Sequence, residues 1–320
     1  MESNVRLPER RLVGLKSQVA EIIGRRLSLC AVERLAEFHG RYLKGMKGGR
    51  RVVLRACNLS GLDLSGFNFS DAELSACDFS NTNLTSAKFV RANLFGAHFT
   101  SANLTNTNFE RADLRGAKFD QAKLYYTHFK GADLRRGEVV GDEGKVLFDP
   151  SCSFKGAALT KSDMATCKMM GVDFDGAALA DVKLTGSDLR DASFDGAKLS
   201  KVEMQGANLA DADMTRTAID EATENSANLM RSKRAQRPPA GERLADILLE
   251  HSKWVRSDRQ EGERADFSQT DLTRYDLSGH FLPGANFNRA VLVSANLTEA
   301  FLAGADMREA ILIGARLEGA

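Results

Sequence analysis

The feature that most constrains this chain is a period of five residues in its large apolar side chains. Between Phe95 and Phe119, in FGAHFTSANLTNTNFERADLRGAKF, a Leu or Phe returns at every fifth position. An α-helix buries residues at a spacing of about 3.6 and a flat strand at a spacing of about 2, so a period of five fits neither. The chain must therefore turn a corner in every five residues to keep its large side chains inside.

We call each five-residue unit a quintet and its large residue the centre. Centres run from Leu59 to Leu134 in 16 quintets, from Phe154 to Ile219 in 14, and from Phe267 to Leu317 in 11, which is about two thirds of the 320 residues. The position two before the centre is nearly always small, so successive turns of the chain can approach to the strand spacing of about 4.8 Å. Short repeats sustained over this length indicate a solenoid.

Quintets such as ADLRG (112–116) and ANLTN (102–106) resemble the A-[D/N]-[L/F]-x-x motif of the pentapeptide repeat family. The resemblance implies a mainly β fold, a right-handed quadrilateral β-helix with four quintets in each coil. In a coil of 20 residues, the first stretch of repeats forms two opposed phenylalanine ladders: Phe69, Phe89, Phe109 and Phe129 on one face, and Phe79, Phe99 and Phe119 on the other. We expect the two ladders to fill the core between them.

Breaks in the repeat divide the chain. We predict an N-terminal helical cap at 1–53, with helices at 9–25 and 29–44, a first β-helix at 54–222, a linker at 223–241, a capping helix and loop at 242–264, and a second β-helix at 265–320. The first β-helix contains an irregular insertion at 135–153, which is either a bulging loop or a deformed coil. A further ladder of Phe154, Phe174 and Phe194 follows that insertion.

The segment before each β-helix carries the same motif. His39 and Tyr42 match His251 and Trp254, and each pair lies on the apolar stripe of a predicted helix that precedes the repeats. An end coil exposes its apolar core and its backbone edge, and an amphipathic helix can cover both. We therefore expect these histidines to be packed cap residues, with a catalytic or ligand-binding role as the alternative.

Motifs for catalysis, metals and cofactors are absent from the sequence. Four of the five cysteines take the small position of a quintet and are expected to be buried thiols: Cys57, Cys77, Cys152 and Cys167. The histidines have no Cys, Ser or carboxylate at a recognisable catalytic spacing, and phosphate-loop and dinucleotide-binding patterns do not occur. We predict a protein that is not an enzyme, with no catalytic, metal or cofactor-binding residue. Since no apolar run approaches the roughly 18 residues of a membrane span, we also predict a cytoplasmic location.

Outward positions near the C-terminus are unusually apolar. The positions that flank a centre should be polar, yet six of them hold large apolar residues: Val291, Val293, Ile311, Ile313, Phe281 and Phe301. Exposed apolar surface of this size usually marks an interface. Either another molecule covers it, which makes a homodimer one form of the protein, or another part of this chain does.

The N-terminal segment is basic, although the whole chain has a formal net charge of only +1. Seven cations crowd one short region: Arg25, Arg26, Arg41, Lys44, Lys47, Arg50 and Arg51. One interpretation is a solvated helix face and loop, and the other is an acidic partner or a peripheral contact with a membrane surface. Nucleic acid is not expected, because no aromatic residues are interleaved with these cations.

These observations favour a bacterial-type scaffold that binds proteins whose identity the sequence does not give. One alternative is a DNA-mimicking protein that binds gyrase, the quinolone-resistance type of this family. A DNA mimic needs a dense negative surface, and residues 154–222, the most acidic block of repeats, carry 8 Lys or Arg against 12 Asp or Glu. A small-molecule sensor or enzyme built on the two His-x-x-aromatic helices is the other alternative.

Overall fold

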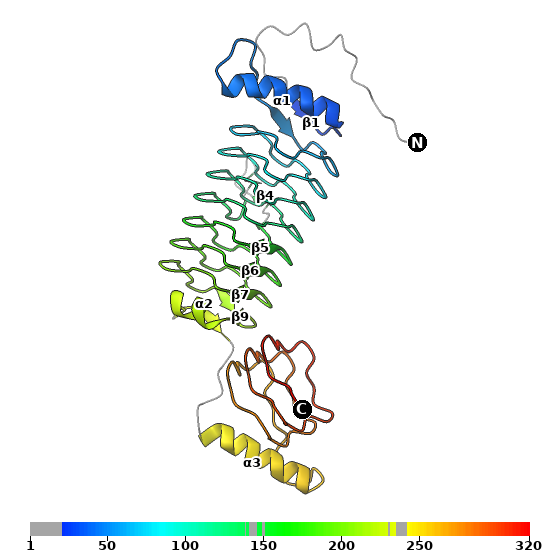
Figure 1. The fold of residues 1–320 in the computed structure, drawn as a ribbon, viewed down its shortest axis with the longest axis vertical. Helices are drawn as coiled ribbons and strands as arrows, with labels where there is room; N and C mark the ends of the chain where they lie inside the picture. Colours follow the sequence, from blue (N-terminus) through cyan, green and yellow to red (C-terminus); the bar gives the residue numbers. More distant parts are fainter. Residues whose placement is uncertain (1–20, 138, 141–145, 149–150, 230, 235–241) are drawn as a thin grey trace, which may run out of the picture.

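The computed structural model describes residues 21–137, 139–140, 146–148, 151–229, 231–234 and 242–320. Figure 1 shows two sets of coils between two helices at opposite ends of the molecule, α1 (Leu29–Leu43) and α3 (Glu242–Arg256). We call the coils of residues 54–222 the first block and those of residues 265–320 the second block, and each has its own hydrophobic core. No helix in the described ranges has the length and apolar character needed to cross a membrane.

A regular coil takes 20 residues, as the parallel bridges between positions 20 apart show. Asp78 is bridged to His98, and His98 to Lys118. The N–H of Leu59 donates to the carbonyl of Asp78 at 2.8 Å, and the N–H of Asp78 donates to the carbonyl of Cys57 at 2.8 Å. Successive quintets repeat this pair of bonds, so four quintets complete one coil and the backbone polar groups between coils are satisfied.

The centres form the core of the first block. Phe79 stacks on Phe99, and Phe89 on Phe109, each with 5.1 Å between ring centroids. The two ladders meet edge to face, with 5.5 Å between the centroids of Phe99 and Phe109. All four rings are fully buried. The prediction of two phenylalanine ladders that fill the core is therefore confirmed, and both contact types are arrangements that aromatic rings favour.

Side chains at the small position of the quintet are buried, and some of them join neighbouring coils by hydrogen bonds. The hydroxyl of Thr82 donates to the carbonyl of Leu59, in the preceding coil, at 3.1 Å. The four cysteines predicted to be buried thiols are buried and free: Cys57, Cys77, Cys152 and Cys167. Burial raises the pKa of Cys152, so its thiol stays protonated and unreactive.

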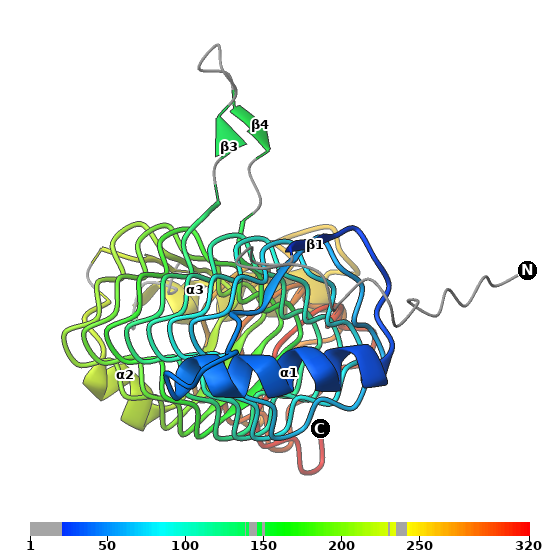
Figure 2. The ribbon, with the colours of Figure 1, turned by 90° about the horizontal axis from the view of Figure 1, so that it is seen from above.

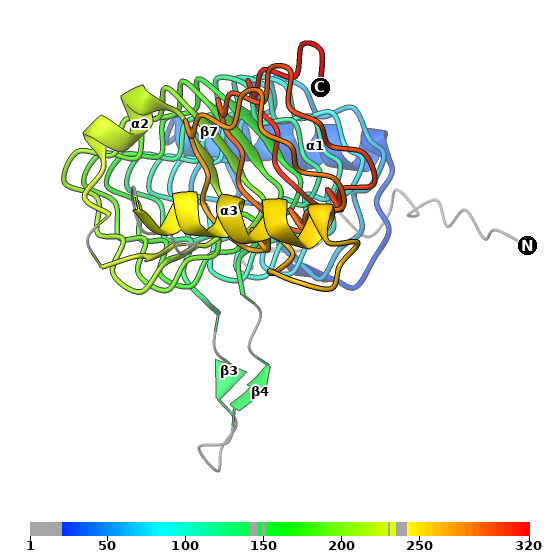
Figure 3. The same ribbon diagram turned by 90° about the horizontal axis from the view of Figure 1, so that it is seen from below.

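The insertion at 135–153 leaves the coil at one corner and returns to it. Lys118 is bridged to Ser153, 35 residues further on instead of 20, and Phe119 stacks on Phe154 with 4.7 Å between centroids. The described part of the insertion is an antiparallel hairpin of β3 (Val139–Val140) and β4 (Val146–Phe148), which projects from the coils in Figures 2 and 3. The insertion is therefore a bulging loop. Consequently the ladder that begins at Phe154 continues the one that ends at Phe119.

The first block ends with a short helix and an added strand. Four of its short strands form one parallel sheet: β5 (Ala158–Thr160), β6 (Ala178–Ala180), β7 (Lys198–Ser200) and β9 (Ala218–Ile219). After α2 (Glu221–Ser226), strand β10 (Lys233–Arg234) pairs in parallel with β8 (Asp213–Met214). A linker was predicted at 223–241. In its described part the chain instead forms the end of α2 and strand β10, which pairs with the last coil. Residues 235–241 lie outside the described residues.

The described start of the chain is a strand, not a helix. β1 (Glu21–Ile23) pairs in parallel with β2 (Val53–Arg55) and places Ile22 opposite Leu54. The helix predicted at 9–25 is therefore wrong over 21–23, and 9–20 lie outside the described residues. The physical reason is the free backbone edge of the first coil, which a strand can satisfy by hydrogen bonds and a helix cannot.

Candidate interaction surfaces

Six outward residues near the C-terminus were predicted to form an apolar surface, and we call them the apolar set. The contact between the two blocks buries some of them and leaves the others exposed. Val291 and Val293 are 3% and 5% exposed and pack against Ala218 at the end of the first block, with Ile311 beside them. All three are outward positions of the second block, so one side of the second block covers the last coil of the first. These residues are therefore covered by another part of the same chain and not by another molecule. The contact also buries the apolar end of the last coil of the first block, which would otherwise be exposed.

Ion pairs surround this apolar contact. Arg216, in the last coil of the first block, pairs with Glu309 of the second block at 2.9 Å. Glu309 also accepts a hydrogen bond from Arg289 at 2.9 Å. Both guanidinium groups lower the pKa of Glu309, and Arg289 has the larger effect. Glu224 and Arg274 form another pair across the contact at 3.6 Å. Since these pairs are partly exposed, they set the orientation of the blocks more than they stabilise the contact.

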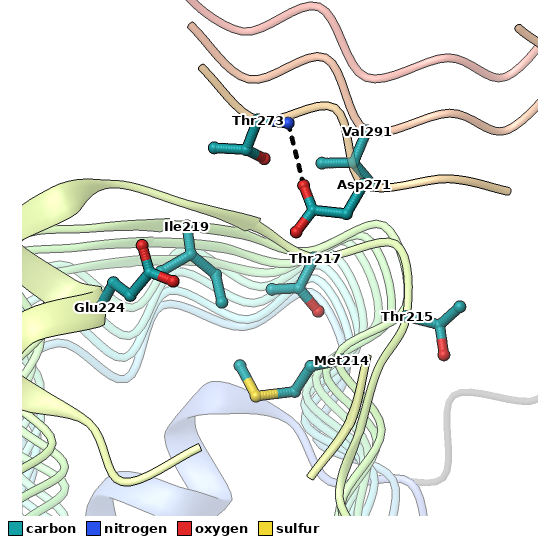
Figure 4. Close-up of a pocket in the computed structure, with 8 residues that line it drawn as sticks. All are labelled: Met214, Thr215, Thr217, Ile219, Glu224, Asp271, Thr273 and Val291. Carbon is teal, nitrogen blue, oxygen red and sulfur yellow. Dashed lines mark hydrogen bonds between the residues drawn. The ribbon is translucent and has the colours of Figure 1, made fainter. Parts of the chain in front are cut away.

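A small cavity lies between the two blocks, as Figure 4 shows. Its lining comes from both: Met214, Thr215, Thr217, Ile219, Glu224, Asp271, Thr273 and Val291. The carboxylate of Asp271 accepts from the N–H of Thr273 at 3.0 Å. The cavity volume of about 10 Å³ is room for about one water molecule. Within the described ranges, moreover, no three His, Cys, Asp or Glu side chains are placed to hold a metal ion.

The other members of the apolar set lie outside this contact. Phe281 and Phe301 are 53% and 49% exposed, and their rings stack with 4.9 Å between centroids. They flank centres two quintets away from the centre that Val291 and Val293 flank, so they lie on the opposite side of the second block. Ile313 is 39% exposed. We call Phe281 and Phe301 the phenylalanine pair.

His39 attaches α1 to the first coils. Its side chain is fully buried, its Nδ1 accepts from the N–H of Val52 at 3.2 Å, and its Nε2–H donates to the carbonyl of Ser70 at 2.8 Å. Because Nδ1 accepts a hydrogen bond, the ring is neutral and carries its proton on Nε2. Burial lowers the pKa of His39 and favours the same neutral form. A buried, neutral and fully bonded ring has a structural role.

His251 repeats this arrangement in α3. Its Nδ1 accepts from the N–H of Ala265 at 3.0 Å, and its ring stacks on Trp254 at 5.5 Å, as the ring of His39 stacks on Tyr42 at 5.7 Å. The duplicated motif of the sequence is therefore a duplicated cap. The copies differ at Nε2, which in His251 is buried without a hydrogen-bond partner in the part of the chain that the structure describes. Burial lowers the pKa of His251 as well.

Sequence reasoning missed a close approach behind each cap helix. A Cβ at Gly49 would lie 2.4 Å from the backbone nitrogen of Tyr42, and a Cβ at Gly262 would lie 2.3 Å from the carbonyl oxygen of Glu250. At both sites the loop that follows the helix returns against the helix backbone, where only glycine leaves enough room. The available signal was a glycine at nearly the same distance after each His-x-x-aromatic motif.

The structure divides the basic set of the N-terminal segment. Arg25 and Arg26 precede α1, whereas Lys44 and Lys47 follow it, and its 15 residues give a length of about 22 Å. The remaining three have partners within the chain: Arg41 with Glu37 at 2.7 Å, Arg51 with the carbonyl of Asp71 at 2.6 Å, and Arg50. The seven cations therefore do not form one continuous patch, because helix formation separates residues that are close in the sequence.

Comparison with protein families gives two matching models. The pentapeptide repeat region model matches residues 50–129, and the model of pentapeptide repeats in eight copies matches 151–191, 177–216 and 285–320. Together the matches cover more than half of the chain. A comparison with curated proteins gives no match.

Three of the solved structures that match are those of pentapeptide repeat proteins. HetL, involved in heterocyst differentiation regulation in the cyanobacterium Nostoc sp. strain PCC 7120, is 22% identical, with 92% of this chain and 99% of that chain covered and a TM-score of 0.28. A protein of the Arabidopsis thaliana thylakoid lumen is 27% identical over 42% of this chain and 68% of that chain, with a TM-score of 0.24. QnrB1, a plasmid-mediated fluoroquinolone resistance protein, is 17% identical over 72% and 96%, with a TM-score of 0.27. TM-scores this low carry no argument about the arrangement of the two blocks or about function.

Proposed function

The chain belongs to the pentapeptide repeat family, and from this premise we propose that it is a non-enzymatic scaffold that binds other proteins. Its two blocks of right-handed quadrilateral β-helix would hold the binding surfaces rigid. We place it in the cytoplasm of a bacterium. A homodimer through the C-terminal coils is one form of the proposal, and peripheral membrane contact through the cations at the N-terminal end is a secondary one.

The phenylalanine pair is the observation that carries this proposal. Two adjacent coils each present a phenylalanine that is about half exposed, at an outward position where the repeat usually has a polar residue. Two hydrogen bonds fix the backbone of Phe301 to the preceding coil. Its N–H donates to the carbonyl of His280 at 2.9 Å, and its carbonyl accepts from the N–H of Leu282 at 2.8 Å. Rigid aromatic anchors on a surface are typical of protein interfaces.

The projecting hairpin of β3 and β4 supports the same function. It leaves the solenoid at one corner and extends away from the coils (Figures 2 and 3). A two-stranded hairpin alone is marginally stable in water, and its outer edges offer backbone groups to a further strand. Addition of a strand from a partner protein is a recurrent mode of recognition. The hairpin is thus a second candidate contact.

The gyrase-binding alternative is disfavoured by how the acidic residues are paired. On one face of the first block, three aspartates each bind the arginine two residues further on: Asp113 with Arg115 at 2.6 Å, Asp133 with Arg135 at 2.7 Å, and Asp188 with Arg190 at 2.6 Å. These pairs neutralise the face, whereas DNA carries a charge at every phosphate. A supercoiling assay with gyrase and excess protein tests this alternative, and we expect no change in activity.

The first test of the scaffold is the solution mass and shape of the wild type and of Phe281→Ser/Phe301→Ser, by light scattering and small-angle X-ray scattering. Both side chains point outward, so the variant should keep its core. A wild-type dimer that the variant converts to a monomer would assign the phenylalanine pair to self-association. A monomeric wild type would leave the pair for a different protein.

A photo-crosslinking residue at position 281, in cells that express the protein, tests whether a protein binds at the phenylalanine pair. The matched control is the same residue in place of Arg308, which is exposed in the same block but lies on another face. We expect a protein adduct at 281 and none at 308. Equal labelling at the two positions, or none at either, would contradict a binding role for the phenylalanine pair.

A further inference from the structure

A corner of the first block presents two adjacent tyrosines to solvent. Tyr125 and Tyr126 are 36% and 47% exposed, and they are two of the four tyrosines in the chain. Tyr126 has a φ of 56°, and it is the only aromatic side chain with a positive φ among the described residues. The left-handed conformation recurs at corners throughout the repeat, as at Asn106 and Gln121, so only the aromatic side chain distinguishes Tyr126 from other corner residues.

Three lysines lie near this corner. Lys123 precedes the tyrosines on the same side of the coil, Lys130 lies at the next corner, and both are exposed. Lys161, in the next coil, places its ammonium 5.6 Å from the centroid of the Tyr126 ring. A cation held against the ring fixes the direction in which the ring projects. We call these five residues the tyrosine corner.

The surroundings of the tyrosine corner are mixed in charge. The coil before it brings amides alongside, since Asn103 is bridged to Lys123 and Asn108 to His128. Three carboxylates are near: Asp163 is bridged to His128, Glu110 is the counterpart of Lys130 one coil earlier, and Asp181 is the counterpart of Lys161 one coil later. The corner therefore carries both signs of charge, and the amides can donate and accept hydrogen bonds.

We propose that the tyrosine corner binds single-stranded nucleic acid. Bases stack on the two exposed rings, and the flanking phosphates contact the ammonium groups of Lys123 and Lys130. This combination of stacking surfaces and adjacent cations is how proteins bind single strands with little sequence preference. An acidic peptide would be attracted by the lysines alone and would not require exposed aromatic rings beside them. The proposal does not rest on the scaffold role.

The preceding coil supplies matched substitutions, because it has the same backbone with different side chains. Tyr125→Thr/Tyr126→Asn gives this corner the side chains of Thr105 and Asn106, and it leaves the charge unchanged. The test is fluorescence anisotropy with a labelled strand of about 12 thymidines. We expect this variant to bind at least about tenfold more weakly, because stacking on each ring is lost.

A second variant tests the phosphate contacts. Lys123→Asn/Lys130→Gln should lower the slope of log K against log salt by about 0.7 for each lysine removed. Lys183→Asn/Lys198→Ala is the control, because it removes two exposed lysines from the same two faces outside the corner. We expect the control to bind as the wild type does. Circular dichroism and thermal unfolding verify that all variants are folded.

Three outcomes would overturn the proposal. The first is no binding at up to about 100 µM protein in low salt. The second is equal binding by the wild type and the tyrosine variant. The third is a polyglutamate peptide of similar length that binds as tightly as the thymidine strand and responds in the same way to both variants, which would assign the lysines to an acidic protein instead.

Discussion

Replacing Val293 with Asp should release the second block from the first without unfolding either one. Val293 packs against Ala218 across the contact and is 5% exposed. It belongs to neither of the two main cores, which are separate clusters of buried side chains. The substitution therefore acts on the contact between the blocks and leaves both sets of coils intact.

The expected magnitude follows from the burial of this side chain. Loss of a buried valine side chain costs roughly 1.5–3 kcal/mol, and a carboxylate at the same place is desolvated as well. Arg274 is one candidate to pair with the new carboxylate, since its backbone N–H donates to the carbonyl of Val293 at 2.9 Å, and its guanidinium already pairs with Glu224 at 3.6 Å. A partly exposed pair would return at most about 1 kcal/mol. The net change of about 2–4 kcal/mol favours the released form by a factor of roughly 30 to 1,000.

Small-angle X-ray scattering measures the release as an increase in the radius of gyration and in the maximum dimension. Ile313→Asp is the matched control, because Ile313 occupies the same outward position one coil further on and is already 39% exposed. We expect the control to scatter as the wild type does and both variants to keep the far-ultraviolet circular dichroism of the wild type. If Val293→Asp leaves the scattering unchanged, the reasoning that this contact holds the blocks together is refuted.

Further predictions concern the caps, the core and the insertion. The folded state lowers the pKa of His39, so the stability that its neutral form contributes is present above the unfolded-state pKa of about 6.5 and is lost as the pH falls through the folded-state pKa. Urea unfolding at a series of pH values should show this decline, and His39→Gln should reduce it. Gly49→Ala and Gly262→Ala should each lower the unfolding temperature, because the new methyl group meets helix backbone; no change would show that the loops can move away. Phe109→Ala should lower the free energy of unfolding by about 3–5 kcal/mol through loss of a ring from the ladder, and a urea midpoint within error of the wild type would contradict the packing. Deletion of residues 136–150 restores the 20-residue spacing across the insertion, so the coils should remain stacked with little change in unfolding temperature, and a loss of cooperative unfolding would show that the hairpin supports the coils.

The elements that the sequence predicted correctly depend on a local rule. A side chain at every fifth position, with a small residue two before it, specifies which residues face inward whatever the rest of the molecule does. The phenylalanine ladders and the buried cysteines follow from that rule. The paired cap histidines were also visible, because the same spacing of His, aromatic residue and repeats occurs twice in the chain.

The predictions that differed from the structure involve contacts between distant segments, or the distance that a helix puts between the residues at its two ends. The strand at Glu21–Ile23 forms because the first coil, some 30 residues later, has a free edge. The seven N-terminal cations are separated because α1 lies between them. The tyrosine corner could have been found from the sequence, since an aromatic residue at a corner position is an exception to the repeat.

The five-residue period by itself determined that the chain forms stacked coils and which side chains fill them, because the period of a solenoid is written into successive residues. Only the tertiary structure decided that one side of the second block closes the end of the first. That contact joins Arg216 to Glu309, 93 residues apart in the chain, and brings Ala218 against Val293. An outward valine looks the same in the sequence whether another molecule or a distant part of its own chain covers it, because burial depends on what the completed fold places opposite it.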